Sequence, residues 1–341
     1  MTSTELQATA KAMVAKGKGI LAIDESNPTC GKRFDKIGIE KTEGNRRDYR
    51  ELLLTTQGLS DHISGAILYD ETIRQSLSDG TPFPEHIEKI GIIPGIKVDT
   101  GAKELAAHPG EKVTEGLDGL RERLAEYKKM GARFAKWRAV ITIGDGMPTR
   151  ACYQANAHAL ARYALLCQEA GIVPIVEPEV LIDGDHTLEQ CYDVTIETLR
   201  NVFSQLANQG VALDGMILKA SMVIAGESCP KQPGVNEVAE RTVRCLRNTV
   251  PAMVAGVAFL SGGQGNEQAT EHLNAMNTMH KDLPWPLTFS YGRALQQPTL
   301  ETWKGKAANV MAAQKLLYHR AKLNGAATVG GYSEQMENEA A

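Results

Sequence analysis

Eight short apolar segments, many of them rich in β-branched residues, recur along the chain near Gly or Pro and constrain its fold more than any other feature. They are Gly19–Asp24, Ser64–Tyr69, Ile93–Val98, Ala132–Arg138, Ile172–Glu177, Gly215–Lys219, Val254–Leu260 and Leu287–Ser290. Most intervals carry a helical pattern, as in Leu120–Met130, Gln154–Ala170, Leu188–Ala207, Val235–Arg247 and Glu267–His280. Strands that alternate with helices indicate a parallel sheet, so eight such units predict an α/β protein with a closed (β/α)8 TIM barrel. An open doubly wound sheet is the alternative.

Helical patterns also flank the predicted barrel, at Glu5–Lys16 and at Asn309–Leu323. Small and acidic residues follow the second of these patterns, and we expect residues 325–341 to form a mobile C-terminal tail. A length of 341 residues is compatible with two domains or with one barrel. Because the chain shows neither a longer internal repeat nor a low-complexity linker, residues 1–341 are predicted to form a single barrel domain.

The charge balance limits the partners of the chain. The 37 basic and 41 acidic residues give a net charge of −4, which does not suit nucleic acid or an anionic membrane, so any anion site must be local. No apolar run reaches the ~18 residues of a membrane span, and Met1–Ala15 lacks the pattern of a signal peptide. We therefore expect a cytoplasmic protein, in which the six scattered cysteines are free thiols.

Polar residues close the apolar segments, at the positions where barrel enzymes carry their chemistry. Residues i and i+2 share one face of a strand, so Lys136 is expected to project the same way as Arg138. The same spacing pairs Glu177 with Glu179. The other segments end at or lead to Asp24, Asp70, Lys97, Asp99, Lys219, Ser261 and Arg293. Charged residues also cap strands where these meet water, which is the alternative for any single position.

Two lysines stand in apolar surroundings that do not suit a solvated loop. Lys136 lies between an alanine and a tryptophan, and Lys219 follows three apolar residues. A lysine in a closed apolar site beside a second cation has a depressed pKa, which leaves a neutral amine able to attack a carbonyl. With Asp24 and Glu177 at the same barrel mouth, the two lysines predict Schiff-base chemistry with acid–base partners.

Two groups of residues are suited to bind anions. The loop Ser261–Gly265 follows the seventh segment and offers backbone N–H groups, and the eighth segment leads to Gly292 and Arg293. Loops after strands seven and eight form the usual phosphate site of such barrels, although a Gly-Gly turn alone is more often only a turn. A second phosphate position is predicted from three cations near the ends of the first, third and fourth segments: Arg33, Lys97 and Arg138.

Metal chemistry is not indicated by the histidines. The eight histidines form neither HExxH nor HxH. The run Asp183–His186 has the composition of a ligand cluster, but it is interpreted as a polar turn because no partner ligands are evident. We predict neither a metal nor a cofactor.

The motifs around these residues resemble class I (Schiff-base) fructose-bisphosphate aldolase over nearly the whole chain. They are GKGILAIDES (Gly17–Ser26), GKR (Gly31–Arg33), GIKVD (Gly95–Asp99), FAKWR (Phe134–Arg138), VPIVEPE (Val173–Glu179), ILKASMV (Ile217–Val223), FLSGGQ (Phe259–Gln264) and FSYGRALQ (Phe289–Gln296). The resemblance implies reversible cleavage of fructose 1,6-bisphosphate to dihydroxyacetone phosphate and glyceraldehyde 3-phosphate.

The resemblance also implies a role for each catalytic candidate. Lys219 would form the imine with the C2 ketone, and Glu177 would be the acid–base group for loss of water. Lys136 would keep Lys219 neutral and assist charge movement, while Asp24 would handle the C4 hydroxyl during C3–C4 cleavage. Glu179 would act through a neighbouring group.

The family further implies two phosphate sites and an assembly. The C1 phosphate would be held by Ser261, Gly262, Gly292 and Arg293. The C6 phosphate would be surrounded by Ser26, Arg33, Lys97 and Arg138. A phosphosugar is thus the expected partner, with no nucleic acid and no membrane, and a homotetramer is implied by the family alone.

Two departures from the family pattern stand out. Ala220 follows Lys219 where many members have Pro, so backbone rigidity there can differ. Well-known eukaryotic members end in a tyrosine that assists proton exchange, whereas this chain ends in Ala341 and its nearest tyrosine is Tyr332. The tail instead offers three carboxylates that a cationic mouth would attract weakly, namely Glu334, Glu337 and Glu339. The alternatives are a non-catalytic phosphosugar-binding or scaffold barrel, and a Schiff-base aldolase with another acceptor.

Overall fold

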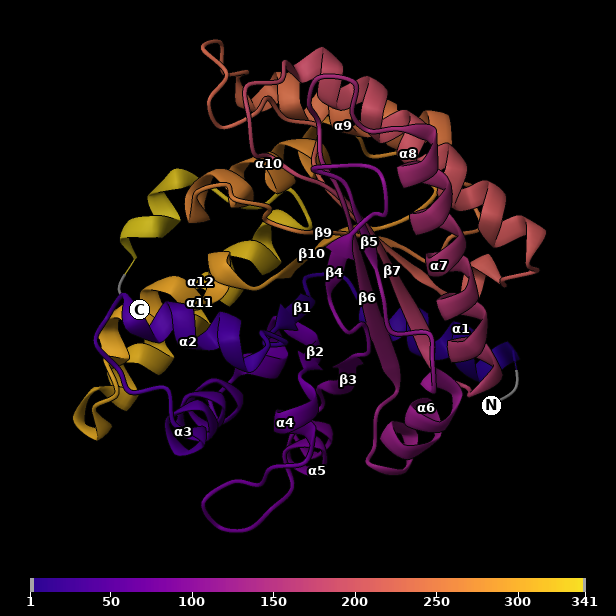
Figure 1. Cartoon of the computed structure of the whole chain (residues 1–341). Coiled ribbons are helices and arrows are strands. Elements are labelled where there is room, and N and C mark those ends of the chain that lie inside the picture. The colour runs from indigo at the N-terminus through magenta and orange to yellow at the C-terminus, as the bar shows by residue number, and fades with distance from the viewer. Residues whose placement is uncertain (1–2, 340–341) are drawn as a thin grey trace.

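Eight parallel strands close into a barrel in the computed structural model, which describes residues 3–339 (Figure 1). Around the barrel the strands follow the order β1-β10-β9-β8-β7-β6-β3-β2. Their bounds are β1 Gly19–Ala22, β2 Ile63–Leu68, β3 Ile93–Lys97, β6 Phe134–Ile141, β7 Val173–Val180, β8 Ile217–Ala220, β9 Val257–Phe259 and β10 Leu287–Tyr291. All eight coincide with the apolar segments of the sequence, so the predicted (β/α)8 barrel is confirmed and the open sheet is excluded.

Helices occupy the intervals and surround the strands (Figure 1). They are α2 Asn27–Asp35, α3 Glu43–Leu54, α4 Asp70–Ile73, α5 Phe83–Lys89, α6 Leu120–Lys129, α7 Arg150–Glu169, α8 Leu188–Asn208, α9 Val235–Thr249, α10 Asn266–Met279, α11 Arg293–Trp303 and α12 Val310–Ala327. Local signals fix several starts, because Thr149 accepts a hydrogen bond from the N–H of Cys152, and Thr187 forms a capping box with Gln190. Short 3-10 turns lie at Leu59–Asp61, Leu213–Gly215, Ala307–Asn309 and Glu334–Asn338.

The amino-terminal helix α1, Ser3–Met13, packs against the apolar interior of the barrel. Leu6, Ala10 and Met13 join one buried cluster with strand residues such as Ile20 and Phe134. The Met13 carbonyl accepts a hydrogen bond of 2.5 Å from the Ser64 hydroxyl at the start of β2, which places α1 at the amino ends of the strands. The opposite end, where the strands finish, is left for the charged residues.

Strand alternation places the charged residues of β6 on one face. Trp137 is fully buried and lies 5.5 Å from the ring of Tyr163 on α7, so it fills the layer between barrel and helices. Lys136 and Arg138 therefore point the other way, into the barrel mouth. The register sets Arg138 beside Glu177 on β7, which brings cations and carboxylates of adjoining strands together.

A two-stranded hairpin that sequence patterning missed follows β3. It consists of β4 Ala102–Glu104 and β5 Lys112–Thr114, paired antiparallel. Each strand has three residues, too few for an alternation to be recognised. The Thr114 hydroxyl donates a 2.8 Å hydrogen bond to the Arg138 carbonyl, which fixes the hairpin beside the barrel mouth.

The carboxyl-terminal segment makes more contacts than the sequence suggested. Helix α12 continues to Ala327, past the predicted end at Leu323 and into the predicted tail. Two acidic residues of the tail then pair with this helix, Glu337 with Arg320 at 2.6 Å and Glu339 with Lys322 at 2.9 Å. For Glu337 and Glu339 the expected attraction to the cationic mouth is therefore wrong, because cations on α12 hold them. For Glu334 it stays a prediction. Mobility of the tail remains a prediction.

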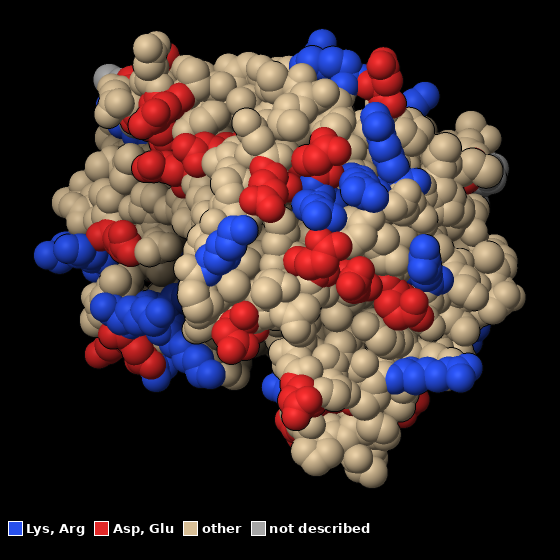
Figure 2. Space-filling view, turned by 90° about the horizontal axis from the view of Figure 1, so that it is seen from above, with Lys and Arg blue, Asp and Glu red and all other residues tan. Residues whose placement is uncertain are grey.

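The outer surface carries both signs of charge. In the face shown in Figure 2, Lys and Arg side chains are interspersed with Asp and Glu, as the small net charge of −4 leads one to expect. Within residues 3–339, no helix combines the length and the apolar character that a membrane crossing requires.

Candidate active site

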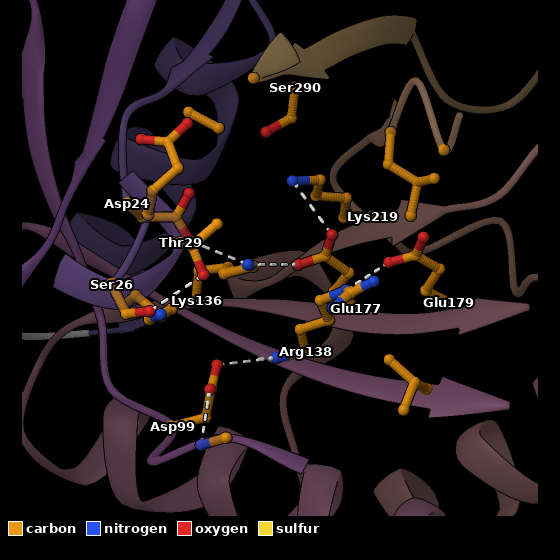
Figure 3. A pocket seen from close by; sticks show the side chains of 18 of the residues that line it. Asp24, Ser26, Thr29, Asp99, Lys136, Arg138, Glu177, Glu179, Lys219 and Ser290 are labelled. Atoms are coloured by element: carbon orange, nitrogen blue, oxygen red, sulfur yellow. Dashed lines mark hydrogen bonds and ion pairs between the residues drawn. The ribbon is translucent and has the colours of Figure 1, made fainter. Parts of the chain in front are cut away.

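A polar cavity of about 420 Å³ opens where the barrel strands end (Figure 3). Of the thirteen residues predicted for the site, all but Arg293 line it: Asp24, Ser26, Arg33, Lys97, Lys136, Arg138, Glu177, Glu179, Lys219, Ser261, Gly262 and Gly292. Every barrel strand except β2 contributes to this set, either from the strand itself or from the segment that follows it. The barrel mouth predicted from the strand ends is thus one continuous cavity.

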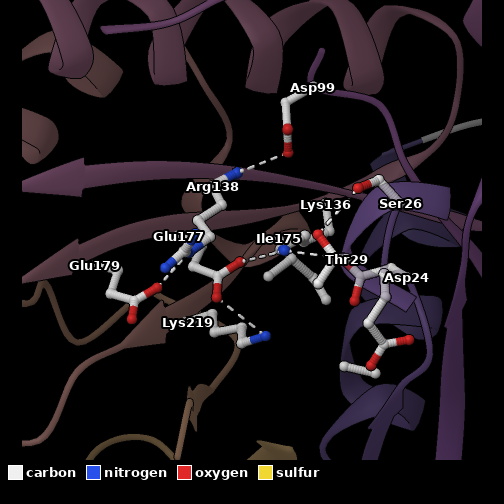
Figure 4. Close-up of polar contacts among 12 residues, drawn as sticks. Asp24, Ser26, Thr29, Asp99, Lys136, Arg138, Ile175, Glu177, Glu179 and Lys219 are labelled. Atoms are coloured by element: carbon white, nitrogen blue, oxygen red, sulfur yellow. Dashed lines mark hydrogen bonds and ion pairs between the residues drawn. The ribbon is translucent and has the colours of Figure 1, made fainter. Parts of the chain in front are cut away.

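The floor of the cavity, defined here by Asp24, Lys136, Glu177 and Lys219, is a connected set of ion pairs (Figure 4). The Lys136 Nζ lies 2.9 Å from Asp24 Oδ2 and 3.0 Å from Glu177 Oε2. The second oxygen of Glu177, Oε1, lies 3.1 Å from Lys219 Nζ. One carboxylate therefore bridges the two lysines, and each floor side chain is at most 13% exposed.

The floor charges support each other against burial. Burial by itself raises the pKa of Asp24, but the nearby Lys136, Lys219 and Lys97 outweigh it and hold that pKa far below its ordinary value. The same balance lowers the pKa of Glu177. Burial disfavours the charged form of Lys136, yet the carboxylates of Asp24, Glu177 and Asp99 raise its pKa above the ordinary range. The floor thus keeps two carboxylates and the Lys136 ammonium ionised.

The surroundings of Lys219 differ from the expectation. The sequence suggested a lysine enclosed by apolar groups, because three apolar residues precede it. Strand alternation turns Met216 and Leu218 to the outer face of the barrel, whereas Ile217 shares the inner face with Lys219. At the end of the strand the Lys219 amine meets Glu177 from β7 and lies opposite Ser290 of β10 (Figure 3). The expectation of apolar surroundings is therefore wrong.

The rim of the cavity, defined here by Arg33, Lys97 and Arg138, is more open. Arg33 on α2 is 28% exposed and pairs with Glu25 at 2.6 Å. Arg138 on β6 is 42% exposed, and its Nε donates to Glu179 on β7. A guanidinium has five N–H donors, so each arginine can keep its carboxylate and still bind an anion.

The loop after β9 turns through two glycines in the left-handed region. Gly262 and Gly263 have φ angles of +49° and +93°, in the left-handed region where residues with side chains are strained. A Cβ on Gly262 would also come within 2.5 Å of the Leu260 side chain. Both glycines are therefore needed for the loop to take this shape. An ordinary turn would need them as well, so phosphate binding at this loop stays a prediction.

A buried glutamine that the sequence analysis did not assign holds this loop. The Gln264 amide donates a 3.0 Å hydrogen bond to the Ser261 carbonyl, so its Oε1 is left to accept from His272 Nδ1 at 2.6 Å. His272 is fully buried on α10, and burial lowers its pKa to about 4, which keeps it neutral. The FLSGGQ motif contained the signal, but a glutamine in a loop gives no sign of its burial.

Arg293 does not line the cavity. It is the first residue of α11, and its Nη2 donates a 2.9 Å hydrogen bond to the Gln264 carbonyl. Arg293 is therefore separated from the other residues predicted for the C1-phosphate site, because its side chain is hydrogen-bonded to the neighbouring loop. Gly292, just before it, does line the cavity.

Four further polar residues line the cavity that were not assigned to the site: Glu25, Thr29, Asp99 and Ser290. Glu25 accepts from Arg33 and also pairs with the buried Arg50 on α3 at 2.8 Å. The Asp99 carboxylate accepts from the backbone N–H groups of Gly101 and Arg138. The sequence marked Asp99 as a strand end only, and Glu25 was hidden because it directly follows Asp24.

The histidine of the run Asp183–His186 and the six cysteines were the remaining candidates for metal or disulfide chemistry. Within residues 3–339, no group of three or more His, Cys, Asp or Glu side chains is placed to hold a metal ion. His186, in the run Asp183–His186, is buried, and its backbone carbonyl accepts from the N–H of Gly226. The six cysteines are free and buried.

Comparison with known proteins decides the family. The family model described as fructose-bisphosphate aldolase class-I matches residues 5–341. The chain belongs to the class I fructose-bisphosphate aldolase family.

The similarity to individual aldolases is high along the whole chain. It is 62% identical to the "Probable fructose-bisphosphate aldolase class 1" of Xanthomonas campestris pv. campestris, over 97% of this chain and 99% of that one. It is 51% identical to "Fructose-bisphosphate aldolase 6, cytosolic" of Arabidopsis thaliana, over 96% of this chain and 91% of the other. The solved aldolase of Plasmodium falciparum, in complex with TRAP and a small-molecule inhibitor, superposes with a TM-score of 0.95 at 50% identity, covering 97% and 95% of the two chains.

Membership settles the reaction class that the motifs indicated. Class I fructose-bisphosphate aldolases are metal-independent lyases that work through a lysine Schiff base, and the aldolase is an enzyme of glycolysis. The alternative of a non-catalytic phosphosugar-binding or scaffold barrel is not favoured. The fold, the activity and the charged cavity thus agree.

Proposed function

We propose that this aldolase carries out the reversible cleavage of fructose 1,6-bisphosphate on Lys219, with Glu177, Asp24 and Lys136 moving protons and charge around it. The observation that supports this assignment best is the bridging carboxylate, since Glu177 lies 3.0 Å from Lys136 and 3.1 Å from Lys219. An amine that must gain and lose protons while it forms an imine needs such a group within hydrogen-bond reach.

Imine formation uses the floor in sequence. The neutral Lys219 amine attacks the C2 carbonyl, forming a C–N bond while the carbonyl oxygen takes up a proton. The Glu177 carboxylate takes up the proton that the attacking nitrogen loses and returns it to the resulting hydroxyl, which leaves as water, so that the nitrogen lone pair forms the cationic iminium. Glu177 suits both transfers because its two oxygens lie within hydrogen-bond reach of the Lys136 and Lys219 nitrogens.

Cleavage uses Asp24 and the iminium. The Asp24 carboxylate accepts the proton of the C4 hydroxyl, the C3–C4 bond breaks, and its electron pair neutralises the iminium to give an enamine. Glyceraldehyde 3-phosphate leaves as the aldehyde. Lys136 helps to keep Asp24 ionised before this step, because its Nζ lies 2.9 Å from Asp24 Oδ2 and, together with Lys219 and Lys97, outweighs the effect of burial on the carboxyl pKa.

The two phosphates are assigned to opposite sides of the cavity. The C1 phosphate would bind the backbone N–H groups of the Ser261–Gly263 loop and of Gly292, with Arg293 nearby. The C6 phosphate would bind the rim residues Arg33, Lys97 and Arg138, with the hydroxyl of Ser26 at the start of α2. Glu179 would act on Arg138 rather than on substrate, because its carboxylate accepts from the Arg138 Nε.

The enamine is protonated, on this account, by barrel groups or water rather than by the tail. The Tyr332 side chain is held away from that task, since its hydroxyl donates a 2.9 Å hydrogen bond to Glu337 and its backbone N–H donates to Asn274 on α10. Protonation of the enamine at C3 and hydrolysis of the imine then release dihydroxyacetone phosphate and restore the Lys219 amine.

The proposed assembly and location rest on the resemblance to the family. We propose a homotetramer, as the resemblance implies, and a cytoplasmic enzyme, since relatives at 51% identity are named as cytosolic. Sedimentation velocity measures the assembly directly, and a monomer at working concentration would contradict it.

The Lys219→Ala variant tests the proposal. Its rate of fructose 1,6-bisphosphate cleavage should fall by a factor of about 10³ or more, because covalent catalysis is removed. The rate is measured by coupled reduction of the released triose phosphates. Lys129→Ala, at an exposed lysine of α6, is the matched control and should retain activity. Substantial turnover by Lys219→Ala would contradict the assignment.

A further inference from the structure

One cation of the cavity has no carboxylate of its own. Arg33, Lys136, Arg138 and Lys219 each form an ion pair with a glutamate or aspartate. Lys97, at the end of β3, lines the same cavity but has no ion-pair partner among residues 3–339. Instead its Nζ lies 4.9 Å from the centroid of the Tyr69 ring.

The strand register explains why these two side chains meet. β2 and β3 are neighbouring parallel strands, and Leu68 is paired with Ile96. Tyr69 and Lys97 are the next residue on each strand, so they lie side by side at the carboxyl ends. Lys97 lines the cavity whereas Tyr69 does not, which puts the ring on the protein side of the ammonium group.

The acidic residues near this pair are occupied elsewhere. Asp70 pairs with Arg74 at 2.9 Å, and Glu71 pairs with Arg46 at 2.6 Å. The Asp99 carboxylate accepts from two backbone N–H groups, of Gly101 and Arg138. Lys97 therefore contacts the face of the Tyr69 ring and none of these three carboxylates, although they lie nearby in sequence or space.

A ring and a carboxylate hold a lysine with different consequences. A carboxylate cancels the positive charge and must be displaced or shared when a phosphate binds. The face of an aromatic ring attracts the ammonium through its quadrupole and leaves the net charge intact. The N–H donors of Lys97 that do not face the ring thus remain available to an anion in the cavity.

From this contrast we propose that Tyr69 is a positioning residue for the C6 phosphate. It holds the Lys97 ammonium, which no carboxylate of residues 3–339 pairs directly, at the rim and so favours bisphosphate over monophosphate substrates. The inference rests on the proposed placement of the C6 phosphate at Lys97. Tyr69 lies outside the cavity and acts on substrate only through Lys97. The preference for bisphosphates depends on the aromatic ring of Tyr69 and not on its hydroxyl.

The test compares Tyr69→Leu with Tyr69→Phe on fructose 1,6-bisphosphate and fructose 1-phosphate. Tyr69→Leu removes the ring, so kcat/KM for the bisphosphate should fall about 3- to 10-fold, mainly through KM. The monophosphate lacks the C6 phosphate and its kcat/KM should change much less. Tyr69→Phe keeps the aromatic face and should retain the bisphosphate preference. Tyr318→Leu, which removes a ring that packs on His62 far along the chain, controls for loss of an aromatic side chain.

Lys97→Met separates failure of this inference from failure of the proposed phosphate site. In the Lys97→Met background, Tyr69→Leu should have no further effect on the substrate preference, because nothing is left to position. If Lys97→Met itself leaves the preference unchanged, the C6 site is misplaced. If Lys97→Met reduces the preference but Tyr69→Leu does not, or affects both substrates equally, Lys97 binds the phosphate and Tyr69 does not position it. Loss of the preference in Tyr69→Phe would assign the effect to the hydroxyl and overturn the inference.

Discussion

The floor and the rim of the cavity both contain cations beside carboxylates, but they differ in exposure. On the floor, Lys136 and Lys219 are 6% and 5% exposed and share the fully enclosed Glu177. On the rim, Arg33 and Arg138 are 28% and 42% exposed and each has its own glutamate. Buried charges interact strongly and lose much when a partner is removed, whereas water screens the exposed ones. The floor is thus built for fixed proton positions, and the rim for reversible binding of an anion.

This comparison orders the expected effects of substitution. A change on the floor should alter chemistry and its pH dependence for every substrate. A change on the rim should alter only the recognition of a phosphate, and a change in the carboxyl-terminal segment should act mainly on stability.

Lys136→Met should have a larger effect than any change on the rim or in the carboxyl-terminal segment, because it removes the cation that pairs with both floor carboxylates. Removing this cation should lower kcat by a factor of about 10²–10⁴, the usual contribution of positioned proton transfer. In the wild type, Lys136 lowers the pKa values of Asp24 and Glu177, so its loss should raise both. If both act as carboxylates, the acid limb of the kcat/KM profile moves to higher pH. Lys129→Met should leave the profile in place, and an unshifted acid limb in Lys136→Met would contradict the electrostatic account.

Arg138→Ala tests whether the rim acts only on recognition of the C6 phosphate. Each charge-assisted contact contributes about 1.5–3 kcal/mol, so cleavage of fructose 1,6-bisphosphate should lose roughly 10- to 150-fold in kcat/KM. Fructose 1-phosphate should be affected much less, because it has no C6 phosphate. Arg33→Ala should behave in the same way, whereas Arg293→Ala should affect both substrates. Equal losses on the two substrates would remove the tested arginine from the C6 site.

Removal of residues 334–341 should have a smaller effect on catalysis. Tyr332 is retained with its backbone bond to Asn274 but loses its partner Glu337, as does Arg320, so cleavage should fall only a few-fold while the fold is destabilised. Glu337→Gln isolates the stability effect and should cost about 1.5–3 kcal/mol in urea unfolding, because Arg320 is buried. Tritium exchange between dihydroxyacetone phosphate and solvent gives the catalytic readout. A loss near a hundredfold, about 2.7 kcal/mol, would show that the tail is catalytic.

Removal of metal ions should have the smallest effect. Imine chemistry needs no Lewis acid, so dialysis against EDTA should leave kcat and KM unchanged on either substrate. Inhibition by EDTA that Zn²⁺ reverses would place the chemistry in another class.

The strands and the floor could be predicted from the sequence because the information is local. Eight apolar segments specified the barrel, and the i, i+2 spacing on β6 and β7 placed Lys136, Arg138, Glu177 and Glu179 in one cavity. A closed parallel barrel brings all strand ends to one side, so local patterns suffice to assemble the site.

The sequence did not reveal contacts that depend on which residues the fold brings together. The burial of Gln264 against His272 joins a loop to the next helix, and the pairing of Glu337 with Arg320 joins the tail to α12. The resting position of Arg293 depends in turn on the Gln264 carbonyl. None of these partners is marked by periodicity, because each is chosen by tertiary packing.

Borohydride reduction of the enzyme with fructose 1,6-bisphosphate, followed by mass mapping of the peptides, tests the central claim most directly. Reduction converts the imine into a stable secondary amine and so marks the lysine that formed it. Lys136 and Lys219 lie on either side of Glu177, so both are available within the same floor. The account predicts a single adduct at Lys219, and an adduct at Lys136 would contradict it.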